Sequence, residues 1–259
     1  MPPFKKVPQT DAIFDNVKHV HEEAAQSDTT LRVSLDSKAT VNIGPFSRGG
    51  HSRVGTKAAD HDFKPDGHLT PFGIFLPDHD DLSLYFTASK VSSDFMVDML
   101  TDWWQRMRSS FAHIRTLVLD LDNGPENSGN RSQFLKRLVD FACWFGLTLR
   151  LVYYPPYHSK YNPIERCWGV LENYWRSELL DSVAAVLGYA GKMTYNGNHP
   201  QVYLNERPYC KGVRLTRPER RELEKKLERT AGLEKWSITI EPGWSLAVAP
   251  VMQLFGPSV

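Results

Sequence analysis

Cysteine is scarce in this chain, and its scarcity excludes several classes of protein. The three cysteines, Cys143, Cys167 and Cys210, form no CxxC pair and no other spacing typical of metal ligands. Because their number is odd, a complete disulfide framework is not expected, and a reducing compartment is the better fit. Cys143 and Cys167 lie in apolar helical patterns, so we expect both to be small core residues.

Long apolar runs and an excess of one charge are missing as well. No stretch approaches the roughly 20 apolar residues of a membrane span, and the first residues lack the apolar segment of a signal peptide. We therefore expect a cytoplasmic protein. The net charge of +1 lacks the basic excess of many nucleic-acid-binding proteins. It does not exclude DNA as a partner, since an acidic metal site would offset basic surface elsewhere.

What is present is an ordered series of strand and helix patterns. Alternating apolar residues predict strands, and apolar residues at steps of three and four predict helices. The strands are expected over 31–43, 70–76, 82–87, 116–122 and 147–154, and the helices over 92–111, 131–145 and 163–180. The order β-β-β-α-β-α-β-α predicts an α/β fold of the ribonuclease H-like kind, with a mixed five-stranded sheet flanked by helices.

The remaining segments show weaker patterns. Residues 1–30 are polar and loosely helical, and we interpret them as a linker or the remnant of an upstream region. Residues 31–182 form the expected ribonuclease H-like domain, and residues 183–259 a C-terminal appendage. Four tryptophans at helical spacing are expected in the core rather than as platforms for base stacking. They are Trp103, Trp104, Trp168 and Trp175.

Three acidic residues occupy positions that this topology would bring together. Asp36 lies on the polar face of the first strand, and Asp122 ends the fourth strand on the face that also carries Asp120. The first and fourth strands are neighbours in this fold, so Asp36 and Asp122 are expected side by side. Glu165 lies in the first turn of the third helix, where it can point back at the strand ends. Converging carboxylates are what two-metal phosphodiester cleavage requires.

Each acid also has a purely structural interpretation. Asp36 by itself has the signature of a turn former, and Asp122 precedes Asn-Gly-Pro, a turn sequence. With Asn162 as N-cap and Pro163 at the first helical position, Glu165 falls at the capping-box position. The conjunction of three acids in one topology favours the catalytic interpretation.

Two sequence blocks resemble a known family. DLDNGPEN at 120–127 and LVYYPPYHSKYNPIERCWGVLENYW at 151–175 are similar to blocks of the DDE transposases of bacterial insertion sequences, in particular the ISAzo-type family. The NPIE-x-x-W pattern also resembles the wider mariner-like superfamily. The resemblance runs from about Ser34 to Trp236. The NPIERCWG and DNGPEN blocks are specific, whereas DSKAT alone is weak.

This resemblance implies metal-dependent DNA strand cleavage and strand transfer during transposition. Asp36, Asp122 and Glu165 match the family's acids, with Asp120 a less suitable second acid because it lies further inside the strand. The implied cofactors are two Mg²⁺ ions, for which Mn²⁺ can substitute, with Asp36 bridging both ions. The implied partners are double-stranded DNA and further copies of the chain on that DNA. The implied location is the bacterial nucleoid.

Seven other residues are candidates for DNA contact. Arg48, His51, Arg53 and Lys57 lie in a Gly/Ser-rich segment that can follow a phosphate backbone, or be a solvated surface loop. The other three candidates lie close to Asp122 or Glu165 in the sequence.

Asn123 follows Asp122 directly, and His158 and Lys160 precede Glu165 closely. Lys160 is a candidate for a phosphate contact, whereas Asn123 and His158 are each explained equally by turn formation.

Three functions remain open at this point. The first is a metal-dependent strand-transfer enzyme, the second a catalytically silent DNA-binding remnant of a decayed element, and the third a nuclease acting on RNA–DNA hybrids. Family members carry an upstream helix-turn-helix region, which this sequence does not contain. We therefore expect a fragment or truncated copy, for which sequence-specific recognition would need another region or chain.

Overall fold

A mixed sheet forms the centre of the computed structural model, which describes residues 7–46, 64–176 and 178–243. Its strands follow the spatial order β7-β4-β3-β1-β5-β6-β9-β8, and β2 pairs with β3 outside this order. β5 and β6 run parallel to β1, whereas β3 runs antiparallel to it. The strands are β1 (Thr30–Ser37), β2 (Val41–Ile43), β3 (Gly67–Leu76), β4 (Asp81–Thr87), β5 (Thr116–Leu121), β6 (Thr148–Tyr153), β7 (Gln201–Asn205), β8 (Glu228–Arg229) and β9 (Ser237–Ile240).

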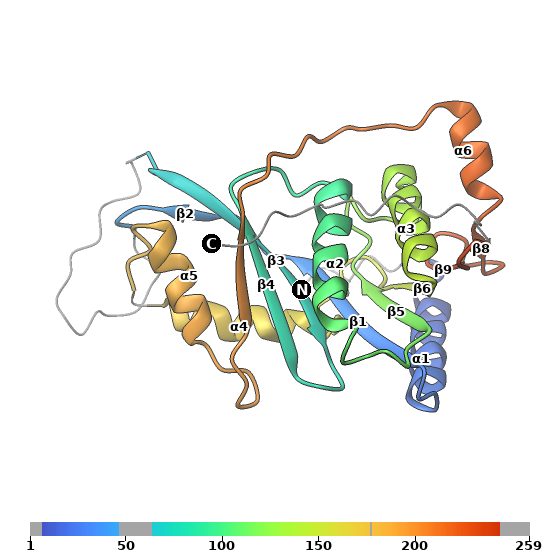
Figure 1. Ribbon diagram of the computed structural model, residues 1–259, viewed down its shortest axis with the longest axis horizontal. Coiled ribbons are helices and arrows are strands. Elements are labelled where there is room, and N and C mark those ends of the chain that lie inside the picture. Colours follow the sequence, from blue (N-terminus) through green and yellow to red (C-terminus); the bar gives the residue numbers. More distant parts are fainter. Residues whose placement is uncertain (1–6, 47–63, 177, 244–259) are drawn as a thin grey trace.

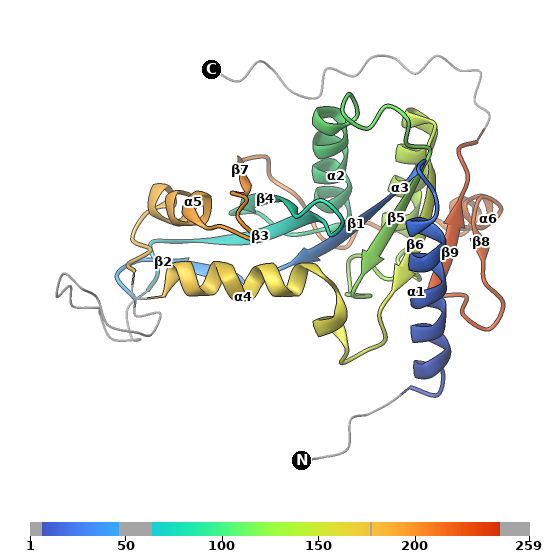
Figure 2. The ribbon, with the colours of Figure 1, turned by 90° about the horizontal axis from the view of Figure 1, so that it is seen from below.

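Helices cover both faces of this sheet. They are α1 (Thr10–Ala25), α2 (Ser93–Met107), α3 (Ser132–Phe145), α4 (Ile164–Trp175), α5 (Val183–Lys192) and α6 (Arg217–Glu224), and a 3₁₀ turn η1 (Ser159–Tyr161) precedes α4. α2 and α3 lie on one face, while α1 and α4 lie on the other (Figures 1 and 2). None of the helices in the described ranges is long and apolar enough to cross a membrane.

The predicted mixed sheet with flanking helices is confirmed, but the sheet is larger than five strands. The five predicted strands form its central part, in the order β4-β3-β1-β5-β6. β7 adds a parallel strand beside β4, and β9 adds an antiparallel strand beside β6. Both come from the region that the sequence predicts as an appendage. The sequence predicts a short strand over 236–240, which corresponds to β9, whereas β7 is too short to be distinguished by its periodicity. The hydrogen bonds of both strands cover the edges of the central strands.

The first predicted strand is divided in two by a bulge. Ser37 pairs with Phe72 and Val41 with Leu69, so three residues of one strand face two residues of the other. The additional residue reverses the side to which the odd-numbered side chains point. As a result, Leu35 joins the core beneath α2 and α3, whereas Val41 joins the core beneath α4. The prediction of one continuous strand over 31–43 was wrong because a single extra residue leaves alternation almost unchanged.

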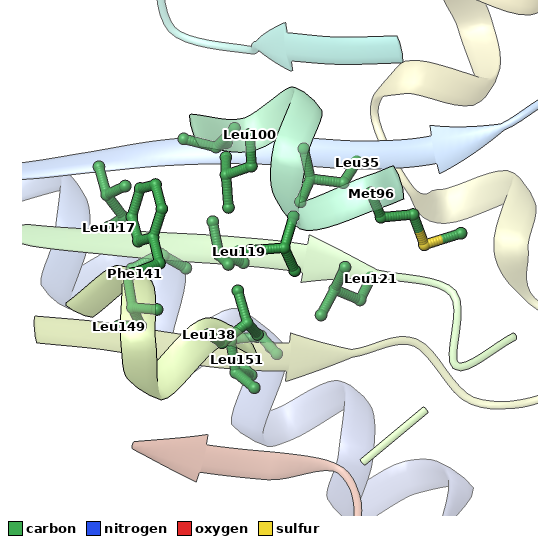
Figure 3. Packing of buried hydrophobic residues seen from close by; sticks show 14 of the residues in the cluster. Leu35, Met96, Leu100, Leu117, Leu119, Leu121, Leu138, Phe141, Leu149 and Leu151 are labelled. Atoms are coloured by element: carbon green, nitrogen blue, oxygen red, sulfur yellow. The ribbon is translucent and has the colours of Figure 1, made fainter. Parts of the chain in front are cut away.

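The alternating leucines of the central strands build the larger core. Leu35, Leu117, Leu119 and Leu151 point toward α2 and α3 and are almost completely buried (Figure 3). Burying such a side chain contributes on the order of 1.5–3 kcal/mol, so this layer holds the central strands in a fixed register. The opposite sides of β1 and β5 are thereby free to carry polar residues.

Two helix ends are capped by residue types that favour those positions, and two helices end earlier than predicted. Ser92 caps α2 by accepting a hydrogen bond from the backbone N–H of Phe95, and Gly146 ends α3 in the left-handed conformation. α2 ends at Met107 rather than 111, and α4 ends at Trp175 rather than 180. α1 falls within the region predicted as a linker and buries one apolar face against the sheet.

Candidate active site

Asp36 lies near the end of β1, on the sheet face that α4 covers. Its side chain is 8% exposed, and its Oδ2 accepts a hydrogen bond of 2.8 Å from the indole N–H of Trp168. In the ladder Asp36 pairs with Gly73 of β3. The carboxylate is therefore buried beneath α4 and held in one orientation by an indole donor.

Asp122 directly follows β5, the strand next to β1. Ser34 pairs with Asp120, so the parallel register places Asp122 beside Asp36 on the same face, with neighbouring strands about 4.8 Å apart. Its Oδ1 accepts hydrogen bonds from the amide of Asn127 at 2.8 Å and from the backbone N–H of Gly124 at 3.2 Å. These two donors fix the carboxylate and leave Oδ2 without a hydrogen bond from any described residue.

Glu165 reaches the same place because the start of α4 is attached to β1. The fully buried side chain of Asn162 accepts a hydrogen bond from the Ser34 hydroxyl and donates one of 3.2 Å to the carbonyl of Leu35. The Ser34 hydroxyl also accepts from the backbone N–H of Ile164 at 3.1 Å. These contacts hold the first turn of α4, and with it Glu165, against the strand that carries Asp36.

The structural interpretation of Glu165 as a capping-box residue is wrong. α4 begins after Pro163, and no side-chain hydrogen bond caps it. Asn162, the predicted N-cap, directs its side chain at β1 instead, because a buried amide gains more from satisfying both Ser34 and Leu35. The carboxylate of Glu165 is thus available for another role.

The ionisation of Asp36 is influenced by the charges of both other acids. Burial and the negative charges of Asp122 and Glu165 together raise the pKa of Asp36 to about 7, against the opposing effect of the Trp168 hydrogen bond. Burial is the largest cause, followed by the charge of Asp122. A nearby cation would therefore stabilise the ionised form of this carboxylate.

The donor set fits hard divalent cations. Within the described parts of the chain, no three His, Cys, Asp or Glu side chains are arranged to hold one ion together. Mg²⁺, however, commonly takes only one or two carboxylates from a protein and completes its shell with water and phosphate. The pairs Asp36 with Asp122 and Asp36 with Glu165 supply that number. The buried Oδ1 of Asn127, beside Asp122, also lacks a donor among the described residues.

Asp120, the weaker candidate for the second acid, is engaged in a different contact. It is completely buried, and its carboxylate bonds to His21 of α1 at 2.6 Å and to Arg32 of β1 at 3.2 Å. Asp120 therefore joins α1 to the sheet. It precedes Asp122 by two residues and is not part of the acidic cluster formed by Asp36, Asp122 and Glu165. This arrangement supports the choice of Asp122.

The predicted DNA contacts divide into two groups. Arg48, His51, Arg53 and Lys57 lie outside the described residues, so their part in DNA binding stays a prediction. Of the other three candidates, Asn123 follows β5, whereas His158, as the N-cap, and Lys160 belong to the η1 turn that precedes α4.

Asn123 makes the turn after β5. It has a φ of 61°, and its Oδ1 accepts from the backbone N–H of Gly129 at 3.2 Å. His158 bonds to the carbonyl of Pro156 at 2.8 Å and stacks on Tyr161. Lys160 is exposed and lies 5.2 Å from the centre of the Tyr161 ring. The turn interpretation fits Asn123 and His158, and a DNA contact by any of the three stays a prediction.

The predictions for the apolar residues are confirmed in the main. Trp103, Trp104, Trp168 and Trp175 are all at most 4% exposed, so they are core residues. Cys167 is buried, which raises the pKa of its thiol to about 12, whereas Cys143 is only partly buried. The sequence did not predict that the indole N–H of the core residue Trp168 also donates a hydrogen bond to Asp36.

Several residues that position the acids were not identified from the sequence. They are Ser34, Asn127, Asn162 and Trp168. A signal was available for Trp168, which follows Glu165 by three residues and therefore shares its helix face. Nothing in the local pattern indicates that Ser34 and Asn162, 128 residues apart, form a hydrogen bond.

Comparison with solved structures finds the same fold in a transposase. The Mos1 transposase paired-end complex with left transposon end aligns with a TM-score of 0.51 and 10% identity, over 73% of this chain and 55% of that chain. The Mos1 mariner paired-end complex with Mn aligns over the same shares with a TM-score of 0.49 and 10% identity. This chain thus spans about half the length of the Mos1 chain.

Sequence comparison gives the family. No curated protein matches the sequence. The family described as the Rhodopirellula transposase DDE domain matches residues 2–242, nearly the whole chain. The likeness in fold and the acidic cluster agree with this match, and the resemblance to DDE transposases is confirmed. The chain belongs to the Rhodopirellula transposase DDE domain family.

Proposed function

We propose that this chain cuts DNA strands at the ends of a mobile element and joins them to a target, using two divalent cations held by Asp36, Asp122 and Glu165. The carrying observation is the position of Asp36, whose pKa is raised by its burial beneath α4 and by the charges of the other two acids. Such a concentration of negative charge is unfavourable unless cations neutralise it. Membership of a DDE transposase family gives the same class of reaction.

The proposed roles follow from where each carboxylate lies. The charges of Asp122 and Glu165 both act on Asp36, so Asp36 would help to hold both cations, and Asp122 and Glu165 would each help to hold one. Two bound cations supply charge stabilisation for the attacking and leaving oxygens of an in-line displacement at phosphorus. Mg²⁺ is the expected ion, with Mn²⁺ as a substitute, because all three donors are carboxylate oxygens.

The surrounding residues keep the carboxylates in position during the reaction. Trp168 holds one oxygen of Asp36, and Asn127 holds one oxygen of Asp122, which leaves the other oxygens to face the cations. In the first step water attacks the phosphodiester, and the bond to the leaving 3′-oxygen breaks. In the second step a 3′-hydroxyl attacks the target phosphodiester, so one ester bond forms as another breaks.

The partners follow from the same proposal. Mos1 transposase, which shares the fold, is seen in a paired-end complex with a transposon end. We infer that double-stranded DNA ends and target DNA are the substrates here, that two or more copies act together on the DNA, and that the bacterial nucleoid is the site of action. Crosslinking with and without duplex DNA tests the assembly, since a purely monomeric species on DNA contradicts it.

A nicking assay tests the chemistry. The purified chain is expected to convert supercoiled plasmid to nicked plasmid with Mn²⁺, and Asp122→Asn is expected to reduce that rate to background. Asp140→Asn is the matched control, because Asp140 lies on α3 in a surface ion pair with Lys136. Equal DNA binding without nicking under any divalent metal would favour the silent DNA-binding remnant. Preferential cleavage of RNA–DNA hybrid would favour a different nuclease.

A further inference from the structure

A polar cavity adjoins the acidic cluster on the side of Asp122. Its volume is about 350 Å³, and Asp122 forms part of its wall, whereas Asp36 and Glu165 do not line it. Its lining comes from the end of β1 with the bulge after it, the start of β3, the β4–α2 loop with the first turn of α2, the β5–α3 loop, and the segment after β7. Residues from these places with a bearing on binding are Thr40, Thr70, Lys90 and Lys211.

The charge of the cavity is positive away from Asp122. Lys90 and Lys211 are exposed, and no carboxylate among the described residues lies in an ion pair with either. The other acid of the wall, Glu126, is already paired with Arg131 at 3.1 Å and accepts a hydrogen bond from Ser93. The two ammonium groups therefore remain available to an anionic ligand.

Both lysines extend from one anchored junction. The backbone N–H of Tyr209 donates to the Ser89 hydroxyl at 2.6 Å, and that hydroxyl lies 3.3 Å from the carbonyl of Tyr209. The phenol of Tyr209 donates to the buried carboxylate of Asp98 at 2.8 Å. Lys90 follows Ser89 by one residue and Lys211 follows Tyr209 by two. The junction thus fixes the backbones from which both ammonium groups reach the cavity.

Neutral donors line the same cavity. The hydroxyls of Thr40 and Thr70 are 2.8 Å apart and exposed to the cavity. Thr40 belongs to the bulge that interrupts the pairing of β1 and β2 with β3. Lysines and threonine hydroxyls are side chains that proteins commonly use for phosphate and sugar contacts of DNA, which orient a strand without reading its bases.

We propose that this cavity binds the sugar–phosphate backbone of the DNA strand that continues from the scissile phosphodiester, with Lys90 and Lys211 contacting its phosphates. The inference rests on the proposed function, because it takes the acids to be the place of cleavage. It adds to that function the path of the DNA strand, which runs from the acids past Asp122 toward the junction of Ser89 and Tyr209. Binding here depends on charge and not on base sequence.

The salt dependence of DNA binding tests this assignment. The probe is a fluorescent 24-base-pair duplex of arbitrary sequence in EDTA, titrated at several salt concentrations. Each phosphate contact contributes about 0.9 to the slope of log K against log salt. Lys90→Ala with Lys211→Ala is therefore expected to reduce the magnitude of this negative slope by about 1.8. This corresponds to roughly 60-fold weaker binding at 0.1 M salt when binding at 1 M is unchanged.

The controls separate a local contact from a general loss of charge. Lys225→Ala with Lys226→Ala removes the same charge at the end of α6, where both lysines are exposed. This pair is expected to leave the slope unchanged, and Lys90→Arg with Lys211→Arg is expected to preserve it. An unaltered slope in the first double variant, or an equal decrease in the α6 pair, overturns the proposal.

A second measurement distinguishes this inference from the proposed function. In plasmid nicking with Mn²⁺, Lys90→Ala with Lys211→Ala is expected to need more protein for half-maximal rate and to keep the rate at saturation. Nicking that depends on Asp122 but shows no change in that concentration overturns only the cavity assignment. Wild-type protein that does not nick at all overturns the proposed function, and with it the path of the DNA strand.

Discussion

At the residue scale, several features of the site meet at Asp36. Its carboxylate is buried, lies beside two other acids and has a single side-chain donor, Trp168. In a protein without bound cations, that environment opposes ionisation. The free energy of folding must therefore change with pH through this one group.

The first prediction concerns Asp36→Asn in metal-free buffer. The folded-state pKa of about 7 lies above the unfolded value near 3.8, so the free energy of unfolding falls as pH rises from about 4 to about 7. Asparagine removes this loss and retains an oxygen for Trp168. The variant is expected to be more stable than wild type by up to about 4 kcal/mol at pH 8 and nearly equal to it at pH 4.

Thermal unfolding at several pH values with a chelator present checks this. Asp140→Asn, at a partly exposed carboxylate in an ion pair, serves as the control and should show no gain that grows with pH. A stability difference for Asp36→Asn that stays constant from pH 4 to pH 8 would contradict the assigned cause.

At the element scale, the site depends on how α4 lies across β1 and β3. Ser34 and Asn162 join the start of the helix to β1, and Trp168 is pressed against β3 at Gly73. A β-carbon at Gly73 would be 2.5 Å from Cδ1 of Ile164 and 2.8 Å from the ring of Trp168. Glycine is thus required by the close approach of the helix, and not by an unusual backbone angle.

The second prediction follows for Gly73→Ala. The terminal methyl of Ile164 can move, but the Trp168 ring is rigid and bonded to Asp36, so α4 must shift away from the sheet. Overpacking of this kind costs about 1–3 kcal/mol. Denaturant unfolding should show that loss, and Mn²⁺-dependent nicking should slow because Glu165 moves with the helix.

Gly67→Ala is the matched control in the same strand. A β-carbon there meets only Cδ1 of Ile43, at an ordinary 3.7 Å. Its stability and nicking rate should remain close to wild type. If both glycine variants behave alike, the close approach of α4 does not determine the geometry of the acids.

Prediction from the sequence succeeded where a regular repeat governs the structure. Asp36 and Asp122 were placed together because side chains alternate along strands and the fold pairs those two strands in parallel. It failed where one residue or a distant contact decides. The bulge after Ser37 leaves little trace in the alternation, and the bond from Asn162 to Ser34 depends on how a helix and a strand meet in space.

At the scale of the whole molecule, the acidic cluster brings together parts of the chain that are far apart in the sequence. Asp36 comes from β1, Asp122 follows β5, and Glu165 lies in the first turn of α4, so the cluster spans two strands and a helix from the other layer. In the absence of cations, the charges of Asp122 and Glu165 destabilise the ionised form of Asp36. Cations that bind only the folded arrangement must therefore stabilise the entire domain.

The last prediction measures this coupling. At a Mg²⁺ concentration tenfold above its dissociation constant, one bound ion stabilises the folded state by about 1.4 kcal/mol. For a chain of this size that raises the Tm by roughly 3–6 °C. The rise should be larger at pH 8 than at pH 5, because protons compete for Asp36 below its pKa of about 7. Asp122→Asn and Glu165→Gln should each reduce the rise, and Asp140→Asn should not. An equal rise in all four proteins would place the stabilising ions elsewhere on the surface and remove the cluster from the reaction.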